Sequence, residues 1–304
     1  MDAMSNAAAL PRTRFVLIEP SHAGNVGAVA RALKVMGFDD LMLVRPRWAD
    51  VLTRPEALER ASGATDVLAA ARCVPTLDDA LHGMTHLCAT AMTPRDFGPP
   101  TRAPRAHFDL LLNQELSALD ALAIDGDLVQ KSPSEHAVPE GVAFLFGSER
   151  YGMKNEDVYR CHVALSIPTD PVYGSLNLAA AVQLIAYDWR QALVQRFGDA
   201  GGFTVQPGHR PQNAPARHAD AAQVSAMLAH LETALIAVDF LDPAAPKKLM
   251  PRLAQLFNRA QLTPEEIHIL RGMAKAMQTA AQADWPARAD PAARAKSAPQ
   301  RQGR

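Results

Sequence analysis

The sequence predicts an α/β fold in which a mainly parallel sheet is flanked by helices, followed by a small all-helical C-terminal domain. Three observations favour this fold. Short segments rich in branched and aromatic residues are almost continuously apolar, as strands are when helices cover both faces of their sheet. Helical patterns alternate with these segments through the first two thirds of the chain. Beyond about residue 220 only helical patterns occur.

The predicted elements of the first part follow in chain order. Strands are expected at RFVLIEP (14–20), LMLVRP (41–46), HLCATAM (86–92), VAFLFG (142–147) and HVALSIP (162–168). Helices are expected at GNVGAVARALKVMG (24–37), TLDDALHG (76–83) and LNLAAAVQLIAYDWRQALVQRF (176–197). Residues 198–220 then concentrate Gly, Pro, Asn and Asp without periodicity, which indicates a linker.

The segment after this linker reads as three helices, at about 221–239, 247–259 and 263–282. The last one begins with Thr263, Pro264 and Glu266, which is a capping box with proline at the first helical position. Residues 284–304 are rich in Ala, Pro and Arg and have little to bury, so we expect a mobile basic tail.

Composition limits the class of protein. The chain has 304 residues, of which 48% are hydrophobic, so it can bury a substantial core. A formal net charge of −1 argues against capture of nucleic acid by the whole molecule, although local clusters could still bind phosphates. No segment approaches the roughly 18 apolar residues of a membrane span, and the N-terminus lacks a signal-peptide pattern. We therefore expect a soluble, cytoplasmic protein.

The cysteines and histidines form no complete set of metal ligands. Cys73, Cys88 and Cys161 form no even framework, which favours a reducing compartment, and Cys73 and Cys161 are expected to be small buried residues. His82 and His86 with Cys88 have a metal-like spacing, but they straddle a helix end and a strand, and no fourth ligand is evident. We predict no metal site.

The first strand-to-helix turn, EPSHAGNVGAVARALKVMG, invites a dinucleotide-binding interpretation. When Gly24 and Gly27 are aligned with the last two glycines of G-x-G-x-x-G, His22 falls where the first glycine is needed. The second strand also ends in VRP instead of an acidic residue, so we disfavour this interpretation. The turn further supplies Asn25 and Arg31, whose simplest roles are a helix N-cap and a solvated helix residue.

Two later loops place polar residues where strands end or helices begin. In VAFLFGSERYGMKNED a strand ends before Gly147 and Glu149, at the strand end where open α/β sheets bind ligands. In IPTDPVYGSLNLAAAVQLIAYDW, Gly174 allows the backbone to approach a ligand, and Ser175 or Asn177 caps the following helix. One cap is enough, so we expect the other side chain to face a substrate.

These segments carry a family resemblance. NVGAVAR, LFGSERYGMKNE and IPTDPVYGSLNLAAAVQLIAY resemble, in this order, the three motifs of the SpoU branch of the SPOUT RNA methyltransferases, which transfer a methyl group from S-adenosylmethionine to a ribose 2′-hydroxyl. FLDPAAPKKLMPRLAQLFNRAQLTPEEIHILRG resembles the helical C-terminal extension of the TrmJ subfamily. That subfamily methylates cytidine or uridine at position 32 of the tRNA anticodon loop.

The resemblance implies a trefoil knot at the carboxyl side of the sheet and a homodimer whose active sites are completed at the subunit interface. It implies S-adenosylmethionine as cofactor, without a metal, and tRNA as partner. It also implies a SPOUT methyltransferase domain at residues 12–197, a linker at 198–220, a tRNA-binding helical domain at 221–283 and the tail at 284–304.

The resemblance further implies roles for individual residues. The catalytic set is Arg31, Asn25, Ser175, Asn177 and Glu149. The cofactor-binding set is Thr90, Ala91, Met92, Gly147, Ile167, Gly174, Ser175 and Leu176. The family usually assigns the position of Arg31 as the activating base, but a guanidinium stays protonated and accepts protons poorly. We expect Arg31 to bind the adjacent phosphate and to stabilise developing alkoxide.

Two basic segments are candidate RNA contacts. The loop TPRDFGPPTRAPR carries Arg95, Arg102 and Arg105, which can grip phosphates, stack on bases or simply be solvated. Where Met92, Thr93 and Pro94 stand, the subfamily commonly has a Ser-Ala-Arg-like run, so contacts known for homologues do not transfer there. The segment PKKLMPRLAQLFNRA has no acidic residue and contains four cations: Lys247, Lys248, Arg252 and Arg259. These cations either bind tRNA or form a solvated helix face.

Three alternatives remain open at this stage. The chain could be a SpoU-type enzyme with another tRNA or rRNA target, a non-catalytic RNA-binding protein of the same fold, or a nucleotide-dependent oxidoreductase. The retention of the five catalytic candidates favours an enzyme over the second alternative.

Overall fold

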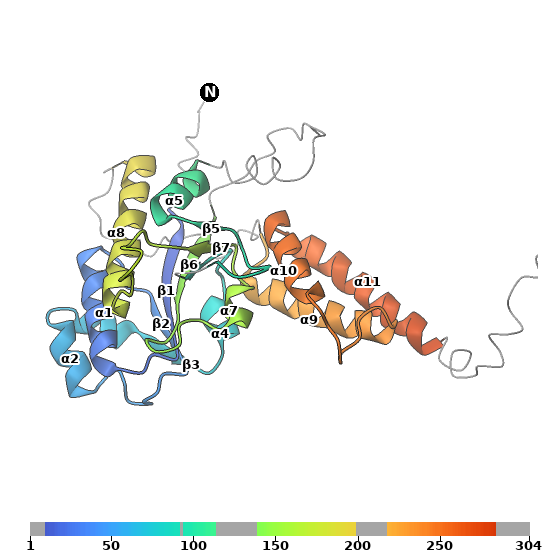
Figure 1. Ribbon diagram of the computed structural model, residues 1–304, viewed down its shortest axis with the longest axis horizontal. Helices are drawn as coiled ribbons and strands as arrows, with labels where there is room; N and C mark the ends of the chain where they lie inside the picture. The colour runs from blue at the N-terminus through green and yellow to red at the C-terminus, as the bar shows by residue number, and fades with distance from the viewer. Residues whose placement is uncertain (1–9, 92–93, 114–138, 199–217, 284–304) are drawn as a thin grey trace, which may run out of the picture.

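The computed structural model describes residues 10–91, 94–113, 139–198 and 218–283 (Figure 1). Its first part contains a seven-stranded sheet in the order β3-β2-β1-β6-β4-β7-β5, and all of its strand pairs are parallel. The strands are β1 (Arg12–Ile18), β2 (Leu41–Val44), β3 (Arg72–Val74), β4 (His86–Thr90), β5 (Thr101–Arg102), β6 (Gly141–Phe146) and β7 (Val163–Leu165). This confirms the predicted parallel sheet.

The helices cover both faces of the sheet, and the last three project to one side of it (Figure 1). They are α1 (Ala23–Val35), α2 (Pro55–Ala61), α3 (Thr65–Ala70), α4 (Leu77–Leu81), α5 (Pro104–Leu112), α7 (Asn155–Val158), α8 (Leu178–Phe197), α9 (Ala221–Ala237), α10 (Leu249–Ala260) and α11 (Pro264–Ala283). None of the described helices is long and apolar enough to cross a membrane.

Strand residues alternate between two apolar layers. In β1, Phe15 and Leu17 belong to the core cluster formed with α1, α5 and α8, while Val16 and Ile18 belong to the cluster formed with α4 and α7. Every residue of β2, β6 and β7 is buried. Both sides of these strands are therefore covered, which explains why their segments are continuously apolar.

The elements predicted from the sequence are all present, but several others are not visible in its periodicity. β3 has three residues and β5 two, and both lie at the edges of the sheet. Such short segments carry too few residues for a pattern to emerge. Almost all of the predicted linker, and the whole of the predicted tail, lie outside the described residues.

Helices α9 and α11 begin with reciprocal caps. The Thr263 N–H donates to Glu266 Oε2 (2.8 Å) and the Glu266 N–H donates to Thr263 Oγ1 (3.3 Å), so the predicted capping box is confirmed. Asp220 and Gln223 form a second capping box at α9. Between the helices lies a small apolar cluster that includes Met227, Leu262 and Ile267, residues far apart in the sequence. This packing stabilises the three helices as a group.

The C-terminal helices also contact the sheet-containing part. The Gly83 N–H donates to Asp220 Oδ2 (3.1 Å), and the Ala221 N–H donates to the Met84 carbonyl (3.0 Å). From α10, Asn258 Nδ2 donates to the carbonyls of Arg160 (3.1 Å) and Cys161 (3.2 Å). Asn258 is buried, so removing this amide would leave backbone carbonyls unpaired.

Gly27 permits the close packing of α1 on α2, and this leads to a testable prediction. A Cβ atom at Gly27 would lie 2.0 Å from the Ala57 carbonyl oxygen, whereas one at Gly24 would lie 3.6 Å from Arg60 Cγ. We expect Gly27→Ala to lower the free energy of unfolding by about 2 kcal/mol, despite the better helix propensity of alanine, because the backbones must move apart. Chemical denaturation measures the change.

The matched control is Gly24→Ala on the same helix. Its new methyl group makes an ordinary van der Waals contact, so this variant should be as stable as the wild type or about 0.5–1 kcal/mol more stable. Equal effects of the two substitutions would contradict the proposed packing role of Gly27.

Candidate active site

Three neighbouring strands bring the predicted cofactor-binding segments to one edge of the sheet. β6, β4 and β7 are adjacent and parallel, so the residues that follow them, Gly147, Ala91 and Ile167, lie at the same carboxyl edge. The Thr90 hydroxyl donates to the Leu145 carbonyl (2.9 Å) and so ties two of the strand ends together. Met92, also predicted to bind the cofactor, lies outside the described residues.

Gly147 begins a tight turn that presents Glu149. A Cβ atom at position 147 would lie 2.0 Å from the backbone carbon of Gly152 and 2.2 Å from the backbone nitrogen of Met153. The turn is closed by a hydrogen bond from the Gly152 N–H to the Ser148 carbonyl (2.8 Å). Glycine is therefore required at 147 by the turn itself.

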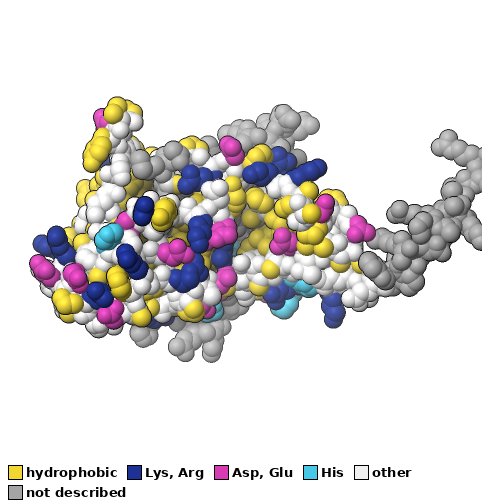
Figure 2. Space-filling model, turned by 60° about the horizontal axis from the view of Figure 1, so that its bottom comes forward, with side chains coloured by type: hydrophobic (Ala, Val, Ile, Leu, Met, Phe, Trp, Pro, Cys, Tyr) yellow, Lys and Arg dark blue, Asp and Glu magenta, His cyan; other side chains and the backbone are white. Residues whose placement is uncertain are grey.

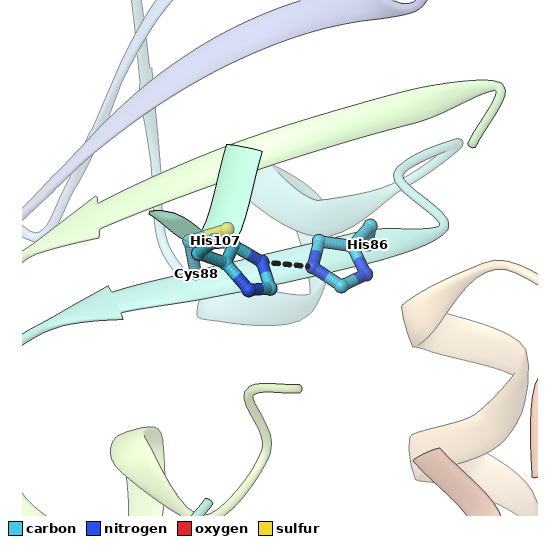
Figure 3. Close-up of side chains that lie close together, drawn as sticks. All are labelled: His86, Cys88 and His107. Carbon is cyan, nitrogen blue, oxygen red and sulfur yellow. Dashed lines mark hydrogen bonds between the residues drawn. The ribbon is translucent and has the colours of Figure 1, made fainter. Parts of the chain in front are cut away.

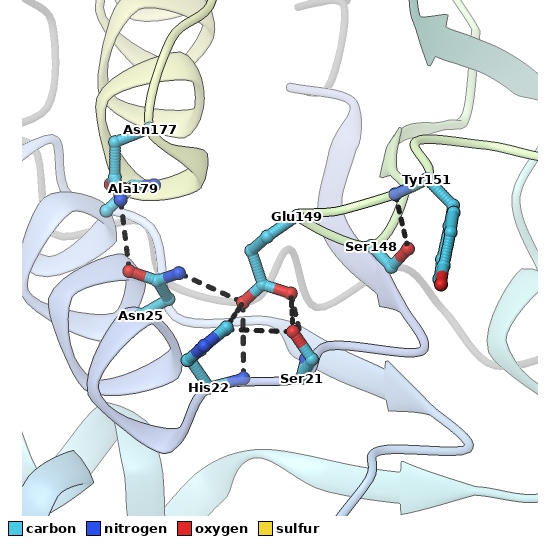
Figure 4. Close-up of polar contacts among 8 residues, drawn as sticks. All are labelled: Ser21, His22, Asn25, Ser148, Glu149, Tyr151, Asn177 and Ala179. Carbon is cyan, nitrogen blue, oxygen red and sulfur yellow. Dashed lines mark hydrogen bonds and ion pairs between the residues drawn. The ribbon is translucent and has the colours of Figure 1, made fainter.

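Glu149 accepts hydrogen bonds from the loop between β1 and α1 (Figure 4). Its Oε2 atom accepts from the Ser21 N–H (2.8 Å) and from the Ser21 hydroxyl (2.7 Å). Its Oε1 atom accepts from Asn25 Nδ2 (2.9 Å) and from the His22 N–H (3.3 Å). Three donors from the loop and one from the first turn of α1 thus converge on a single carboxylate.

The third motif joins this network through Asn25. Asn177 Nδ2 donates to Asn25 Oδ1 (3.1 Å), while Asn177 Oδ1 accepts from the Ala179 N–H (2.9 Å) and so caps α8 (Figure 4). The interpretation of Asn25 as a helix N-cap is wrong, because α1 has His22 at its N-cap and Asn25 lies inside the helix. Its amide instead links the carboxylate of the second motif to the third motif.

The hydrogen bonds keep Glu149 ionised. Burial by itself raises the pKa of Glu149, but the hydrogen bonds from Asn25 and Ser21 outweigh that effect and hold the pKa below its ordinary value. The charged form is thus the one that joins the loops. The stabilisation from this depressed pKa is present above the ordinary value and is lost as the pH falls through the folded-state value.

We expect Glu149→Gln to lower the free energy of unfolding by about 2 kcal/mol, although the two side chains have nearly the same shape. The Ser21 N–H and Asn25 Nδ2 each donate to a carboxylate oxygen of Glu149. In the variant, the NH₂ group of glutamine would replace one of these oxygens, so that two donors would face each other. Denaturant unfolding at pH 7.5 measures the effect. Glu156→Gln on α7 is the control, because Glu156 is exposed, and it should change stability by less than about 0.5 kcal/mol. A Glu149→Gln protein as stable as this control would contradict the proposed role of the carboxylate.

Other predicted site residues lie outside this network. Arg31 is exposed on α1, six residues beyond Asn25, and among the described residues no side chain pairs with its guanidinium. Ser175 and Leu176 are exposed and Gly174 is half-buried in the segment that leads into α8. In the same segment Tyr173 is 83% exposed, so this part of the chain presents apolar surface to solvent.

The predicted RNA-binding residues fall into three groups. Arg105 forms an ion pair with Asp188 of α8 (2.8 Å), and Arg102 adds a smaller contribution to the lowered pKa of His86, which burial mainly causes. In the second group, Lys248, the N-cap residue of α10, and Arg252 within this helix lie over the Phe97 ring, 5.4 and 5.0 Å from its centroid. The remaining residues are the half-buried Arg95 and the exposed Lys247 and Arg259.

Positive charge is interspersed with negative charge over much of the surface. On the face shown in Figure 2, Lys and Arg side chains gather across the middle with Asp and Glu side chains among them. Glu19, for example, pairs with both Arg45 (3.1 Å) and Lys154 (3.2 Å). Surface pairs of this kind contribute little to stability but locally cancel the attraction for phosphate.

Three polar side chains form a buried cluster beside β4. The ligand atoms that His86, Cys88 and His107 offer lie within 4.8 Å of one another, and His86 Nε2 and His107 Nε2 are hydrogen-bonded at 3.0 Å (Figure 3). The sequence pattern had grouped His82 with His86, but His82 is exposed, and His107 of α5 is the actual neighbour. Cys161 is buried as predicted, whereas the prediction for Cys73 is wrong, because it is exposed on edge strand β3.

Sequence reasoning missed Ser21 and His22, which supply three of the hydrogen bonds to Glu149. Both stand directly after β1, at the same carboxyl edge as the other motifs. Polar residues at that point of a parallel sheet are a signal for a ligand site.

Comparison with known proteins agrees with this geometry. Residues 12–187 match the model of the SpoU rRNA Methylase family, a segment that contains all three connected loops. The chain belongs to the SpoU methylase family. Residues 222–286 match a second model, described as the C-terminal domain of the tRNA methyltransferase TrmJ. Within the SpoU methylases, the chain is therefore a member of the TrmJ group.

TrmJ relatives are similar over nearly their whole length. The tRNA (cytidine/uridine/adenosine-2′-O-)-methyltransferase TrmJ of Pseudomonas aeruginosa is 38% identical over 87% of this chain and 93% of that protein. The tRNA (cytidine/uridine-2′-O-)-methyltransferase TrmJ of Klebsiella pneumoniae is 36% identical over 87% of this chain and 95% of that protein. The crystal structure of TrmJ from Z. mobilis ZM4 matches with a TM-score of 0.63 and 28% identity, over 89% of this chain and all of that chain.

Proposed function

We propose that the chain is an S-adenosylmethionine-dependent tRNA 2′-O-ribose methyltransferase that acts on cytidine or uridine at position 32 of the anticodon loop. The observation that carries this proposal is the hydrogen-bonded chain from Ser21 through Glu149 and Asn25 to Asn177, which joins all three motif loops. The TrmJ relatives, whose names specify tRNA 2′-O-methylation, support the same reaction.

The residues at the sheet edge fit S-adenosylmethionine, which supplies a methyl group on a positively charged sulfur. Main-chain groups at Thr90, Ala91 and Gly147 stand at the ends of neighbouring strands, where an adenine is recognised by backbone more than by side chains. Ile167 packs partly against the core, and Leu176 is 37% exposed, so both offer apolar surface. We also include Met92 and Gly174 in this cofactor-binding set.

Catalysis then rests on orientation and charge. Methyl transfer requires the ribose 2′-oxygen to be held in line and to lose its proton, and orientation alone supplies much of the rate. Glu149, Asn25 and Asn177 hold the loops in one arrangement, and we assign them as positioning residues. Because Asn177 caps α8, Ser175 is the side chain left to face the substrate. Arg31 binds an RNA phosphate and stabilises the developing alkoxide.

A homodimer with active sites at the subunit interface is part of the proposal. Arg31 and Asn25 lie about 9 Å apart along the axis of α1 and on different sides of it, so Arg31 does not extend the network of its own subunit. Apolar side chains are exposed on α1 and α8, which pack against each other: Val35 (63%), Leu184 (42%) and Tyr187 (45%). An interface between two copies would cover this apolar surface and bring Arg31 to the partner's site.

The trefoil knot and the domain division also stay proposals. The placement of β6 between β1 and β4 and the return of the chain from β7 to α8 are compatible with a knot. We assign residues 12–197 to the methyltransferase domain and 221–283 to a tRNA-binding helical domain, joined by the linker at 198–220 and followed by the tail at 284–304. The basic residues Arg95, Arg102, Arg105, Lys247, Lys248, Arg252 and Arg259 are proposed RNA contacts.

The test is mass-spectrometric mapping of 2′-O-methyl groups in tRNA from cells with and without this protein, and in transcripts treated with the purified chain. The expected result is a methyl group at position 32 that requires both the protein and S-adenosylmethionine. A methyl group at another tRNA or rRNA position would replace the assigned target. Unmodified RNA with intact RNA binding would instead support a non-catalytic homologue.

A further inference from the structure

Phe97 lies where the sheet-containing part meets helix α10. It belongs to the loop that follows β4, and its main-chain carbonyl accepts a hydrogen bond from the Gln255 side chain. Lys248 and Arg252 lie over its ring, yet the residue is still 42% exposed. The φ angle of Phe97 is 59°, which is rare for a bulky residue. An exposed aromatic ring thus lies beside two cations.

The charges around this ring suit one class of partner. Between Asp242 and Glu265 the sequence contains no acidic residue, but it contains Lys247, Lys248, Arg252 and Arg259. This stretch of the chain therefore carries a net charge of about +4, in a protein whose overall formal net charge is −1. This stretch therefore offers a polyanion a local attraction that the overall charge does not provide. An aromatic ring beside such cations is the arrangement with which proteins bind unpaired nucleotides.

The position of the loop connects this ring to the transfer site. Phe97 is seven residues beyond Thr90, so the chain between them spans at most about 25 Å. That distance lies within the size of a single RNA loop. An unpaired base of the same RNA loop can therefore reach the ring while the ribose is at the sheet edge.

We propose that Phe97 stacks on an unpaired base of the tRNA substrate, while Lys248 and Arg252 beside it bind the flanking phosphates. The inference rests on the proposed function, because it takes tRNA as the substrate, and it adds a substrate-binding residue that the three motifs do not contain. Phe97 acts on RNA binding and not on the chemistry of transfer.

Three variants test this role with tRNA binding, cofactor binding and single-turnover methylation. Phe97→Ala should weaken tRNA binding by about tenfold, the size of one lost base–aromatic stack, with little change in S-adenosylmethionine affinity or in the rate at saturating tRNA. Phe97→Trp should retain wild-type affinity, because a larger ring still stacks. Gln255→Ala is the control, because it removes the other contact between α10 and the same loop and leaves the ring.

Salt dependence separates stacking from charge. Phe97→Ala should leave the slope of log Kd against log salt concentration unchanged, because no charge is removed. The double variant Lys248→Gln with Arg252→Gln should lower this slope by roughly 0.7–0.9 for each lost phosphate contact. The inference is overturned if Phe97→Ala binds tRNA as tightly as the wild type, or if Gln255→Ala weakens binding equally, since Phe97 would then only join the two parts. If the wild-type protein methylates tRNA, neither of these two results contradicts the proposed function. A wild type that methylates no tRNA refutes the proposed function itself.

Discussion

Arg31→Ala is expected to slow methyl transfer by at least about a hundredfold in single-turnover assays, while the affinity for S-adenosylmethionine stays within about twofold. The loss is of the size found when one group that stabilises developing negative charge is removed from an active site. Arg31 is exposed, and none of the described side chains pairs with it, so its removal should leave the fold intact. Thermal unfolding of the variant checks that expectation.

Lys34→Ala is the matched control for Arg31→Ala. Lys34 lies one turn further along α1 and also carries a positive charge, but it pairs with Asp66 (2.7 Å). Its removal should alter the rate less than about threefold. A similar loss in both variants would mean that the general charge of α1, and not the position of Arg31, matters.

The pH profile of Arg31→Lys distinguishes the two chemical roles of Arg31. If the guanidinium acts as a cation, the transfer rate should climb with pH at the same slope in the wild type and in Arg31→Lys. A slope that disappears in Arg31→Lys would identify Arg31 as the titrating group and overturn its assignment as a phosphate- and alkoxide-binding residue.

Mild acid is expected to destabilise the protein strongly, by about 4 kcal/mol at pH 5.5 relative to pH 7.5. The cause is the buried cluster of Figure 3, in which His86 is 3% and His107 1% exposed. Burial, with the charges of Arg102 and His162 nearby, lowers the pKa of His107 to about 3 and the pKa of His86 well below its ordinary value. His162, whose pKa burial lowers to about 4, adds to the loss.

The direction follows from proton binding. In the unfolded chain these imidazoles take up protons near pH 6.5, whereas in the folded protein they stay neutral to a much lower pH. Between these values the unfolded state binds more protons, so the free energy of unfolding falls as the pH falls below about 6.5. Each buried histidine contributes about 1.4 kcal/mol per pH unit in this range. Above about pH 7 the contribution is constant.

Denaturant unfolding at several pH values between 5.5 and 7.5 measures this slope. The double variant His86→Gln with His107→Gln should be less stable at pH 7.5. Its free energy of unfolding should also depend less steeply on pH, because the contribution of two histidines is removed. The exposed His268→Gln on α11 is the control and should keep the wild-type slope. A double variant with the wild-type slope would show that other groups cause the acid sensitivity.

Much of the architecture could be predicted because burial on both sides of the sheet leaves a direct trace in the sequence. β6, for example, is buried at every position and is continuously apolar. The capping box of α11 could be predicted, and the cap of α8 could be narrowed to Ser175 or Asn177, because a capping side chain bonds within two or three residues of itself. Local contacts of this kind need no knowledge of the tertiary structure.

The site could be predicted only in part, because its decisive contacts join distant positions. Asn25 and Glu149 are 124 residues apart, and no periodicity relates them. The family resemblance selected both residues, but not the carboxylate as the common acceptor, nor Ser21 as the donor of two of its hydrogen bonds. The histidine cluster was missed for the same reason, since His107 comes from α5, which the sequence pattern had not revealed.

Strand β4 is held from both directions by the C-terminal helices. The turn that enters it, at Gly83 and Met84, bonds to the start of α9, and the loop that leaves it bonds through Phe97 to α10. An evolutionary exchange of the helical extension between relatives would therefore have to replace the flanks of this strand as well. The extension and the central strand should be inherited together as one module, and chimaeras that cut at residue 220 alone should assemble poorly.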